Sequence, residues 1–364
     1  MRPKRIAILT GGGDCPGLNA VIRAVAKKAM GEGCEVAGFE DGYEGLVRNK
    51  VKKLENHDVS GILTLGGTIL GTSNVANPYH YAIESKDCKV TFKDYHRRAV
   101  NNFKKLKADA LVAIGGDGTL SIAHRLYEDG IPVIGVPKTI DNDILGTDIT
   151  FGFDTAVWVA TEGIDRIHTT AQSHHRAMII EVMGRTAGWI ALHAGVAGGG
   201  DIILIPEIPY DINVVVKKIK ERHGKGKRFS IIVISEGAKP KGGDVVVKRI
   251  VKKSFESARL GGISFVLGSQ IEKLACGIET RAVIMGHLQR GGSPTPFDRV
   301  LATQLGTRAV DFINEGAFGH MVAVRNNEFV KVSLRDVAKG KRLVPKNHPL
   351  VESARSVGTC FGDR

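Results

Sequence analysis

Short apolar runs alternate with amphipathic stretches along most of the chain. The first run, residues 5–10, is followed by a glycine-rich loop and by apolar residues at helical spacing from 18 to 30, where Gly31 and Gly33 end the predicted helix. Strands that alternate with helices predict a mostly parallel sheet with helices on both faces, so the expected fold class is α/β. Further strands are expected at residues 35–39, 110–114, 133–136, 177–182, 202–205 and 231–235.

Three stretches depart from this pattern. Residues 74–98 are polar and aromatic-rich, which predicts a loop followed by the start of a helix. Residues 239–253 are rich in lysine and glycine and then amphipathic, so we expect a solvated surface helix there rather than a membrane contact. Residues 345–364 show no strong pattern.

Composition narrows the class of protein. A chain of 364 residues that is 43% hydrophobic can bury a large core and is expected to form two domains. The net charge is +13, but the lysines are spread out and lack interleaved aromatic residues, so no nucleic-acid partner is expected. No apolar run approaches the roughly 18 residues that a membrane span needs. The five cysteines form no C-x-x-C pair, which favours a reducing cytoplasm over a disulfide framework.

Two short motifs carry the main chemical signal. The sequence GGDGT at residues 115–119 and the sequence KTIDND at 138–143 each follow a predicted buried strand. Ligands of open α/β sheets bind beyond the carboxyl ends of the strands, so the aspartates 117, 141 and 143 are expected in one cleft with glycine amides. Glycines allow close approach to phosphate, and carboxylates hold Mg²⁺ or accept a proton. This pattern predicts phosphoryl transfer, although Asp117 alone is also explained as a cap of the helix near Leu120.

Asp141 and Asp143 are two positions apart. On an extended segment their side chains face the same side and Asn142 faces the other. Two crowded carboxylates raise one another's pKa unless a metal or an arginine separates them. One aspartate can then act as a general base while the other orients it or reaches Mg²⁺, whereas an Asx-turn explains one of them but not both.

Three other loops contribute glycines or cations. Residues 10–17 (TGGGDCPG) join a strand to a helix start, a place for an anion, but match neither a Walker loop nor G-x-G-x-x-G. Arg185 follows another strand, and Arg290 lies in a glycine-rich loop, with Arg281 nearby in sequence. Arginine forks suit phosphate. The pair His174 and His175 has no third ligand beside it, so no metal is expected there.

Taken together, these ordered motifs resemble the 6-phosphofructokinase family from about residue 6 to about residue 327. The resemblance implies phosphoryl transfer to the 1-hydroxyl of fructose 6-phosphate with Mg²⁺. It implies that Asp141 is the catalytic base, that Thr139, Asp143 and Arg185 assist, and that Asp117 is associated with the metal. The implied donor-binding residues are Gly13, Tyr43, Gly116, Gly118, Thr119 and Lys138. The implied substrate-binding residues are Arg176, Met183, Gly184, Arg185, Glu236, Arg281, His287 and Arg290.

The resemblance also implies an assembly and a division into domains. In the family, the positions of Arg176 and Arg281 reach the active site of a neighbouring subunit, which implies a homotetramer or a homodimer. Two similar three-layer α/β/α domains are expected, with the active site in the cleft between them. We expect residues 1–152 and 289–338 in the phosphoryl-donor domain and residues 153–288 and 339–364 in the sugar-phosphate domain.

The donor of the family is either ATP or pyrophosphate, and the signature of this chain is mixed. Pyrophosphate enzymes usually carry an acidic residue where this chain has Gly118, and a carboxylate there would crowd and repel the α-phosphate of a nucleotide. Pyrophosphate enzymes usually carry a lysine at the position of Lys138, so this residue favours pyrophosphate. A bulky residue at position 118 would exclude ATP, whereas the charge of Lys138 is compatible with either donor. The glycine at 118 therefore weighs more, so ATP is the favoured donor and pyrophosphate the alternative.

The chain departs from the family at three places. Asn74 stands where many members have an arginine that bridges the two phosphates. Of the basic residues of the bacterial allosteric site, Arg23 is matched, but Lys27 and Asn56 replace two others. The stretch 237–279 is longer than in compact bacterial enzymes and has no assigned role.

Three other functions remain open from the sequence. An enzyme like NAD kinase would share GGDGT but would not need the motifs at 139–143 and 183–185. A non-catalytic phosphosugar sensor would keep the pocket without needing its aspartates. A third alternative is a different acceptor, such as sedoheptulose 7-phosphate or a nucleoside.

Overall fold

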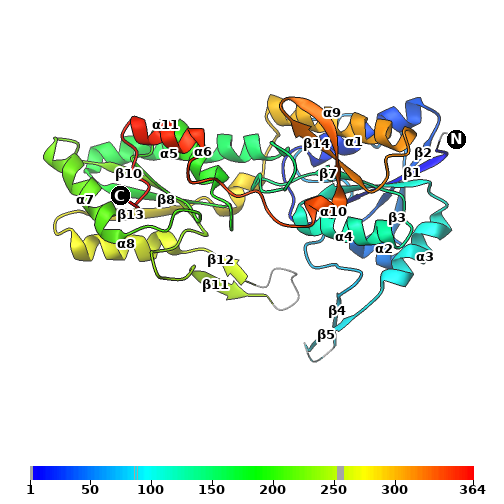
Figure 1. Ribbon diagram of the computed structural model, residues 1–364, viewed down its shortest axis with the longest axis horizontal. Coiled ribbons are helices and arrows are strands. Elements are labelled where there is room, and N and C mark those ends of the chain that lie inside the picture. The colour runs from blue at the N-terminus through cyan, green and yellow to red at the C-terminus, as the bar shows by residue number, and fades with distance from the viewer. Residues whose placement is uncertain (1–2, 86, 88, 252–257) are drawn as a thin grey trace.

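The computed structural model describes residues 3–85, 87, 89–251 and 258–364. The chain forms two lobes side by side, each built around a mainly parallel β-sheet with helices on both faces (Figure 1). The amino terminus lies in one lobe and the carboxyl terminus in the other. This arrangement confirms the α/β fold class and the two similar three-layer lobes expected from the sequence. No helix of the described residues is long and apolar enough to cross a membrane.

The first lobe contains a seven-stranded sheet in the order β15-β14-β7-β6-β1-β2-β3, and only the two edge strands run antiparallel to their neighbours. Its strands are β1 (Arg5–Thr10), β2 (Glu35–Phe39), β3 (Val51–Leu54), β6 (Ala110–Gly115), β7 (Val133–Pro137), β14 (His320–Arg325) and β15 (Glu328–Ser333). Its helices are α1 (Leu18–Gly31), α2 (Tyr43–Arg48), α3 (His96–Leu106), α4 (Asp117–Glu128), α9 (Pro296–Asn314) and α10 (Leu334–Val337).

Alternation along the central strands explains why both faces of this sheet are covered. In β1, Ile6 and Ile8 belong to the core shared with α1 and α9, while Ala7 and Leu9 belong to the core shared with α3 and α4. Successive side chains of a strand point to opposite faces, so a strand that is apolar throughout must be covered on both sides.

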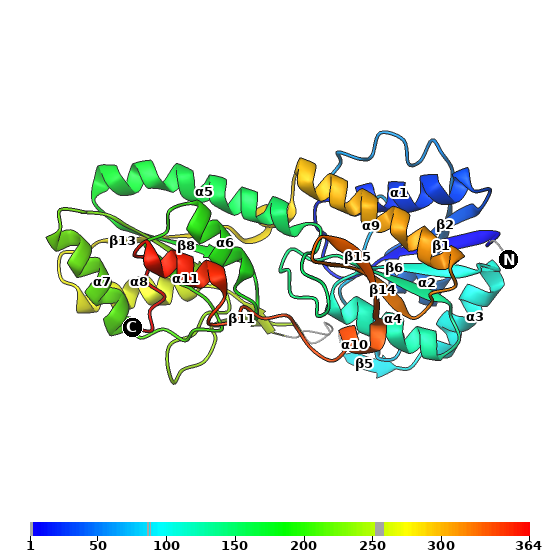
Figure 2. The same ribbon diagram turned by 45° about the horizontal axis from the view of Figure 1, so that its top comes forward.

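The second lobe contains a four-stranded, fully parallel sheet in the order β13-β8-β10-β9. Helices α5, α6 and α11 lie on one face of it, and α7 and α8 lie on the other (Figure 2). Its strands are β8 (Ala177–Val182), β9 (Ile202–Leu204), β10 (Ser230–Ser235) and β13 (Thr280–Ile284). Its helices are α5 (Phe153–His174), α6 (Trp189–Ala197), α7 (Ile212–Gly224), α8 (Ile263–Leu274), α11 (Pro349–Ser356) and the 3₁₀ helix η1 (Gly286–Arg290).

Two hairpins lie outside the sheets. In the first, β4 (Tyr81–Glu84) pairs with β5 (Val90–Lys93), in a stretch where the sequence predicted only a loop before the helix start. In the second, β11 (Val247–Ile250) pairs with β12 (Ala258–Leu260), so the surface helix expected at residues 239–253 is wrong over its described part. Three consecutive valines, 245–247, favour an extended backbone because β-branched side chains lose rotamer freedom in a helix.

The chain crosses between the lobes several times. After β7 it enters the second lobe at α5, returns through η1 to α9, β14 and β15, and crosses again to α11. The boundaries expected at residues 152, 288 and 338 remain a prediction. α11 forms within the last residues, where the sequence showed no strong pattern.

Candidate active site

A cleft of about 800 Å³ lies between the lobes, where the carboxyl ends of β1 and β6 face those of β8 and β10. The first lobe supplies glycine-rich loops and three aspartates, and the second lobe supplies longer polar side chains. Most of the predicted site residues line it: Gly13, Tyr43, Gly116, Asp117, Gly118, Thr119, Lys138, Thr139, Asp141, Met183, Arg185, Glu236, His287 and Arg290.

Thr119 packs beneath the two glycine-rich loops of the donor half. A Cβ atom on Gly11 would lie 2.7 Å from Thr119 Oγ1, so only glycine allows the first loop to approach this closely. The Tyr43 hydroxyl donates a hydrogen bond to the Thr119 carbonyl at 2.7 Å. Thr119 and Tyr43 thus fix the floor of the cleft beside the amino terminus of α4, whose free amides suit a phosphate.

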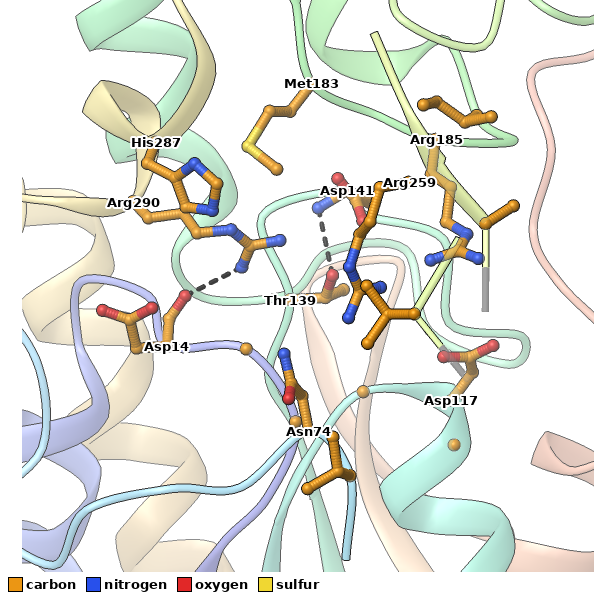
Figure 3. Close-up of a pocket in the computed structure, with 18 of the residues that line it drawn as sticks. Asp14, Asn74, Asp117, Thr139, Asp141, Met183, Arg185, Arg259, His287 and Arg290 are labelled. Atoms are coloured by element: carbon orange, nitrogen blue, oxygen red, sulfur yellow. Dashed lines mark hydrogen bonds between the residues drawn. The ribbon is translucent and has the colours of Figure 1, made fainter. Parts of the chain in front are cut away.

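Asp117 is the first residue of α4, and Gly116 is its N-cap residue. Because the N-cap residue is a glycine, no side chain there accepts a hydrogen bond from the helix amides, and the interpretation of Asp117 as the helix cap is not supported. Its carboxylate instead lines the cleft, with 34% of the side chain exposed (Figure 3).

The loop after β7 holds the reactive carboxylate. The Asp141 amide donates to Thr139 Oγ1 at 3.1 Å, which turns the chain and presents the Asp141 side chain to the cleft (Figure 3). Asn142 has a left-handed backbone, with φ of 51°, and its Oδ1 accepts from the Thr150 amide at 3.1 Å. The extended backbone expected for this segment is therefore wrong, because buried Asn142 anchors a turn.

The same turn separates the two aspartates. Asp141 lines the cleft, whereas Asp143 is only 4% exposed and lies behind the cleft wall. Within the described part of the chain, no group donates a hydrogen bond to the buried Oδ1 of Asp141. A buried carboxylate oxygen without a donor is costly for folding and is suited to accepting a proton from a bound hydroxyl.

Burial dominates the electrostatics of three carboxyl groups. Desolvation raises the pKa of Asp141, although Arg290 and Lys341 oppose the shift. Desolvation, followed by repulsion from Asp141, raises the pKa of Asp143 to about 7 and that of Glu236 to about 7. Perturbed carboxyl groups that gather in one cleft are typical of acid–base sites.

Lys341 is a charged residue of this site that the sequence did not predict. Its Nζ lies 3.0 Å from Asp117 Oδ2 and 3.1 Å from Asp143 Oδ2. Burial lowers the pKa of Lys341, but the carboxylates of Asp143 and Asp117 outweigh burial and leave it raised. The residue lies in a segment without a motif, more than 190 positions from either aspartate, so no local signal could have placed it here.

The sugar half begins with the loop after β8. Gly184 has φ of 137°, and a Cβ there would lie 2.5 Å from the Ala187 carbonyl oxygen, so the tight turn requires glycine. Gly184 does not line the cleft itself; it shapes the loop that carries Met183 and Arg185. The Arg185 amide donates to Glu236 Oε1 at 3.3 Å.

Two cations donate hydrogen bonds to carbonyl groups of the glycine-rich loop after β1. Arg290 comes from η1, and its Nη1 donates to the Asp14 carbonyl in the first lobe at 2.9 Å. Lys138 is 3% exposed, and its Nζ donates to the Gly13 carbonyl. Burial lowers the pKa of Lys138. Asn74, whose side chain is a neutral amide, also lines the cleft (Figure 3).

Arg176 and Arg281 are placed differently from the other predicted residues. Neither lines the cleft of its own chain. Both contact Glu279 on the outside of the second lobe, with Arg176 Nε 2.7 Å from Glu279 Oε2. The two arginines therefore share one surface.

The hairpin β11–β12 also contributes to the cleft. Lys248, Arg249 and Arg259 line it from the second lobe, and Figure 3 shows Arg259 among the lining side chains. Glu181, at the end of β8, anchors the chain after β12 by accepting from the Gly262 amide at 2.8 Å. The lysine-rich composition of this stretch indicated only a solvated surface, so the sequence missed this contribution.

The geometry defines a phosphotransferase cleft between two α/β lobes, and comparison with known proteins identifies the family. The sequence profile of the phosphofructokinase family matches residues 5–313. The chain therefore belongs to the phosphofructokinase family, which confirms the resemblance seen in the motifs.

Three relatives cover nearly the whole chain. It is 53% identical to ATP-dependent 6-phosphofructokinase 2 of Clostridium perfringens, over 100% of both chains. It is 51% identical to ATP-dependent 6-phosphofructokinase of Chloroflexus aurantiacus, over 100% of this chain and 99% of the relative. It is also 49% identical to pyrophosphate–fructose 6-phosphate 1-phosphotransferase of Amycolatopsis methanolica, over 94% of this chain and 96% of the relative.

Solved structures agree with the fold. Phosphofructokinase of Pichia pastoris in the T-state superposes with a TM-score of 0.79 at 32% identity, over 93% of this chain. This chain spans only 36% of that longer protein. A pyrophosphate-dependent phosphofructokinase of Marinobacter aquaeolei also gives a TM-score of 0.79, at 20% identity and over 99% of this chain and 92% of the other, and this likeness concerns the fold alone.

Proposed function

We propose that the chain transfers the terminal phosphoryl group of ATP to the 1-hydroxyl of fructose 6-phosphate, giving fructose 1,6-bisphosphate. The observation that carries this proposal is the position of Asp141. Its carboxylate, with a buried oxygen that has no donor among the described residues, lies between a glycine-lined half and a half lined by arginine, histidine and glutamate. Phosphoryl transfer requires such an arrangement because its catalysis is mainly positioning and charge neutralisation.

Asp141 acts as the general base in this proposal. Its carboxylate accepts the proton of the 1-hydroxyl as the oxygen attacks the terminal phosphorus, and the bond between that phosphorus and the bridging oxygen of ATP breaks. Thr139 holds the turn that presents Asp141. Arg185 lines the cleft beside this point and stabilises the charge of the transferring group.

The donor half binds the triphosphate through backbone amides. Gly13 and the loop 116–119 supply close approach, Tyr43 supports Thr119, and Lys138 adds positive charge from below. Gly118 leaves room where a larger residue would meet the nucleotide.

The donor set fits Mg²⁺ held jointly by protein and substrate. Among the described residues, no three His, Cys, Asp or Glu side chains gather to hold a metal by themselves. Mg²⁺ is commonly bound by one or two carboxylates together with substrate phosphates, and Asp117 is a partly exposed carboxylate on the donor side of the cleft. When bound, the ion would neutralise charge on the transferring phosphates.

The sugar half selects a phosphorylated ketose. Glu236 accepts hydrogen bonds from sugar hydroxyls, Met183 packs against the ring, and His287 and Arg290 bind the 6-phosphate. Gly184 sets the turn of this loop.

Arg176 and Arg281 complete the site of a neighbouring copy, which makes the enzyme a homotetramer or homodimer. Both arginines lie together on the outer surface of the second lobe. The large apolar side chains Trp158, Leu288 and Val300 are more than half exposed, which supports a subunit interface. The wide spacing of the cysteines supports work in the cytoplasm.

Pyrophosphate is the second candidate donor, because Lys138 places a buried cation at the phosphate end of the cleft. A coupled assay with fructose 6-phosphate and Mg²⁺, run in parallel with ATP and with pyrophosphate, tests the proposal. Turnover with ATP alone is the expected result. Turnover with pyrophosphate alone would overturn the choice of donor, and no turnover with either would favour another acceptor or a non-catalytic sensor.

A further inference from the structure

The segment from Lys341 to Val344 runs from the first lobe toward the second and passes behind the loop after β7 that carries Asp141, which we call the catalytic loop. We call residues 341–344 the strap. Lys341 forms an antiparallel bridge with Ile144, and the Arg342 amide donates to the Asp143 carbonyl at 2.8 Å. The Arg342 guanidinium donates to the Asn142 carbonyl at 3.2 Å. The strap is therefore bonded to the catalytic loop at three consecutive residues.

The other side of the strap is bonded to the second lobe. The Arg342 guanidinium lies 4.1 Å from the ring of Trp189, whose Nε1 donates to the Arg342 carbonyl at 2.9 Å. Glu207 accepts from the Val344 amide at 2.9 Å and from the Gly188 amide at 3.0 Å. Gly188 directly follows the turn that the Ala187 amide closes onto the Gly184 carbonyl. The strap therefore joins the loop after β7 to the loop after β8.

Lys341 is the residue through which the strap reaches two carboxylates of the site, those of Asp117 and Asp143. Its Nζ lies within 3.1 Å of one oxygen of Asp117 and one oxygen of Asp143. Asp117 is on α4 and Asp143 is on the loop after β7, so one ammonium group ties two elements together. The Asp143 side chain is only 5% exposed, and a buried carboxylate needs a cationic or donor partner close by.

On this basis we propose that Lys341 is a positioning residue for phosphoryl transfer, holding Asp117 and Asp143 in place from the strap until donor and metal arrive together. The inference rests on the proposed function, because the aspartates matter only if the cleft transfers phosphate. It assigns to the segment after β15 a role in catalysis beyond that of a linker between lobes.

The test compares Lys341→Met, which removes the charge and keeps much of the length, with Lys341→Arg, which keeps the charge. The Met variant is expected to lower kcat by about 50-fold or more while KM for fructose 6-phosphate changes less than threefold, since Lys341 does not line the cleft. The Arg variant should recover at least a tenth of the wild-type kcat. A Met variant with kcat within threefold of wild type would overturn the proposal.

A second readout does not depend on activity. Binding of Mn²⁺ alone, measured by titration calorimetry without nucleotide or sugar, should tighten at least fivefold in the Met variant, because a cation that competes for Asp117 has been removed. The Arg variant should bind Mn²⁺ as the wild type does. Equal or weaker Mn²⁺ binding by the Met variant would show that Lys341 does not hold these carboxylates, and would refute the proposal.

Lys339→Ala is the matched control, because Lys339 is exposed, lies two residues away and pairs with Asp336 instead. It should match wild type in both readouts. If Lys341→Met does not fold, Lys341→Gln replaces it in both arms with the same expectations. Should wild type itself be inactive with both donors, the proposed function fails, while the Mn²⁺ comparison still decides whether Lys341 holds Asp117 and Asp143.

Discussion

Replacing Asp141 with asparagine tests the central residue of the proposed mechanism. The two side chains are nearly the same size, and the buried Oδ1 of Asp141 accepts no hydrogen bond from any described residue, so the change breaks no such bond at that atom. What the change removes is the ability to accept a proton. General-base catalysis typically contributes 10²- to 10⁴-fold, which corresponds to about 2.7 to 5.5 kcal/mol in the activation barrier.

We therefore expect Asp141→Asn to lower kcat by about 10²- to 10⁴-fold with little change in KM for ATP. The assay is the coupled measurement with ATP and fructose 6-phosphate at saturating Mg²⁺. Asp148→Asn is a suitable control, because Asp148 is an exposed carboxylate nearby in the chain that accepts from the Asn326 amide. A kcat within threefold of wild type would refute the assignment of Asp141 as the base.

The same variant should be more stable than wild type at pH 8. Burial raises the pKa of Asp141 in the folded protein, so the folded state binds this proton more tightly than the unfolded state does. Stability linked to the group is then present at low pH and is lost as pH rises from the unfolded pKa through the folded one. An asparagine escapes this loss, so Tm should rise at pH 8 and differ less at pH 5. A lower Tm at pH 8 would mean that the carboxylate stabilises the fold.

Two other predictions follow from the geometry. The kcat/KM for fructose 6-phosphate should decline as pH falls below about 7. The pKa values of Glu236 and Asp143 are raised to about 7, and both groups must be ionised for activity. A profile that is flat from pH 8 to 5.5 would contradict this prediction. Gly184→Ala should raise KM for fructose 6-phosphate more than tenfold and leave KM for ATP within threefold, because the new Cβ would meet the Ala187 carbonyl. Gly224→Ala should leave both KM values unchanged, because no atom of the described residues lies within 4 Å of the new Cβ.

The sequence predicted the core of the fold well for a physical reason. Strands such as β6 and β10 are apolar on both faces, since parallel sheets between two helical layers bury every side chain, and such runs stand out against polar loops. The helix expected at 239–253 failed because its apolar residues are β-branched and pair across a hairpin. The spacing of apolar residues along the chain does not show which residues pair across a hairpin.

The sequence likewise predicted some residues of the candidate site and missed others. Residues that directly follow buried strands, such as Asp117, Asp141 and Arg185, could be placed in one cleft because parallel strands end at the same edge of a sheet. Asp143 was expected beside Asp141 in the cleft, but a left-handed Asn142, held by Thr150, turns it to the rear. Lys341 was missed because its contacts depend on how the segment after β15 folds back onto loops that are far away in the sequence.

The catalytic loop is thus recognisable from its own residues but is not shaped by them alone. The Thr150 amide donates to the Asn142 side chain and fixes the turn of the loop. Lys341 pairs with the Asp143 carboxylate, and the Arg342 guanidinium donates to the Asn142 carbonyl. Arg342 in turn packs on Trp189 of the second lobe, while Arg290 of that lobe bonds the Asp14 carbonyl at the opposite side of the cleft. Because contacts at both sides of the cleft join the lobes, a shift of one lobe against the other must also move the aspartates relative to the sugar loop. The distance between base and acceptor is therefore a property of the whole two-lobed structure, set by residues that lie far from the motifs.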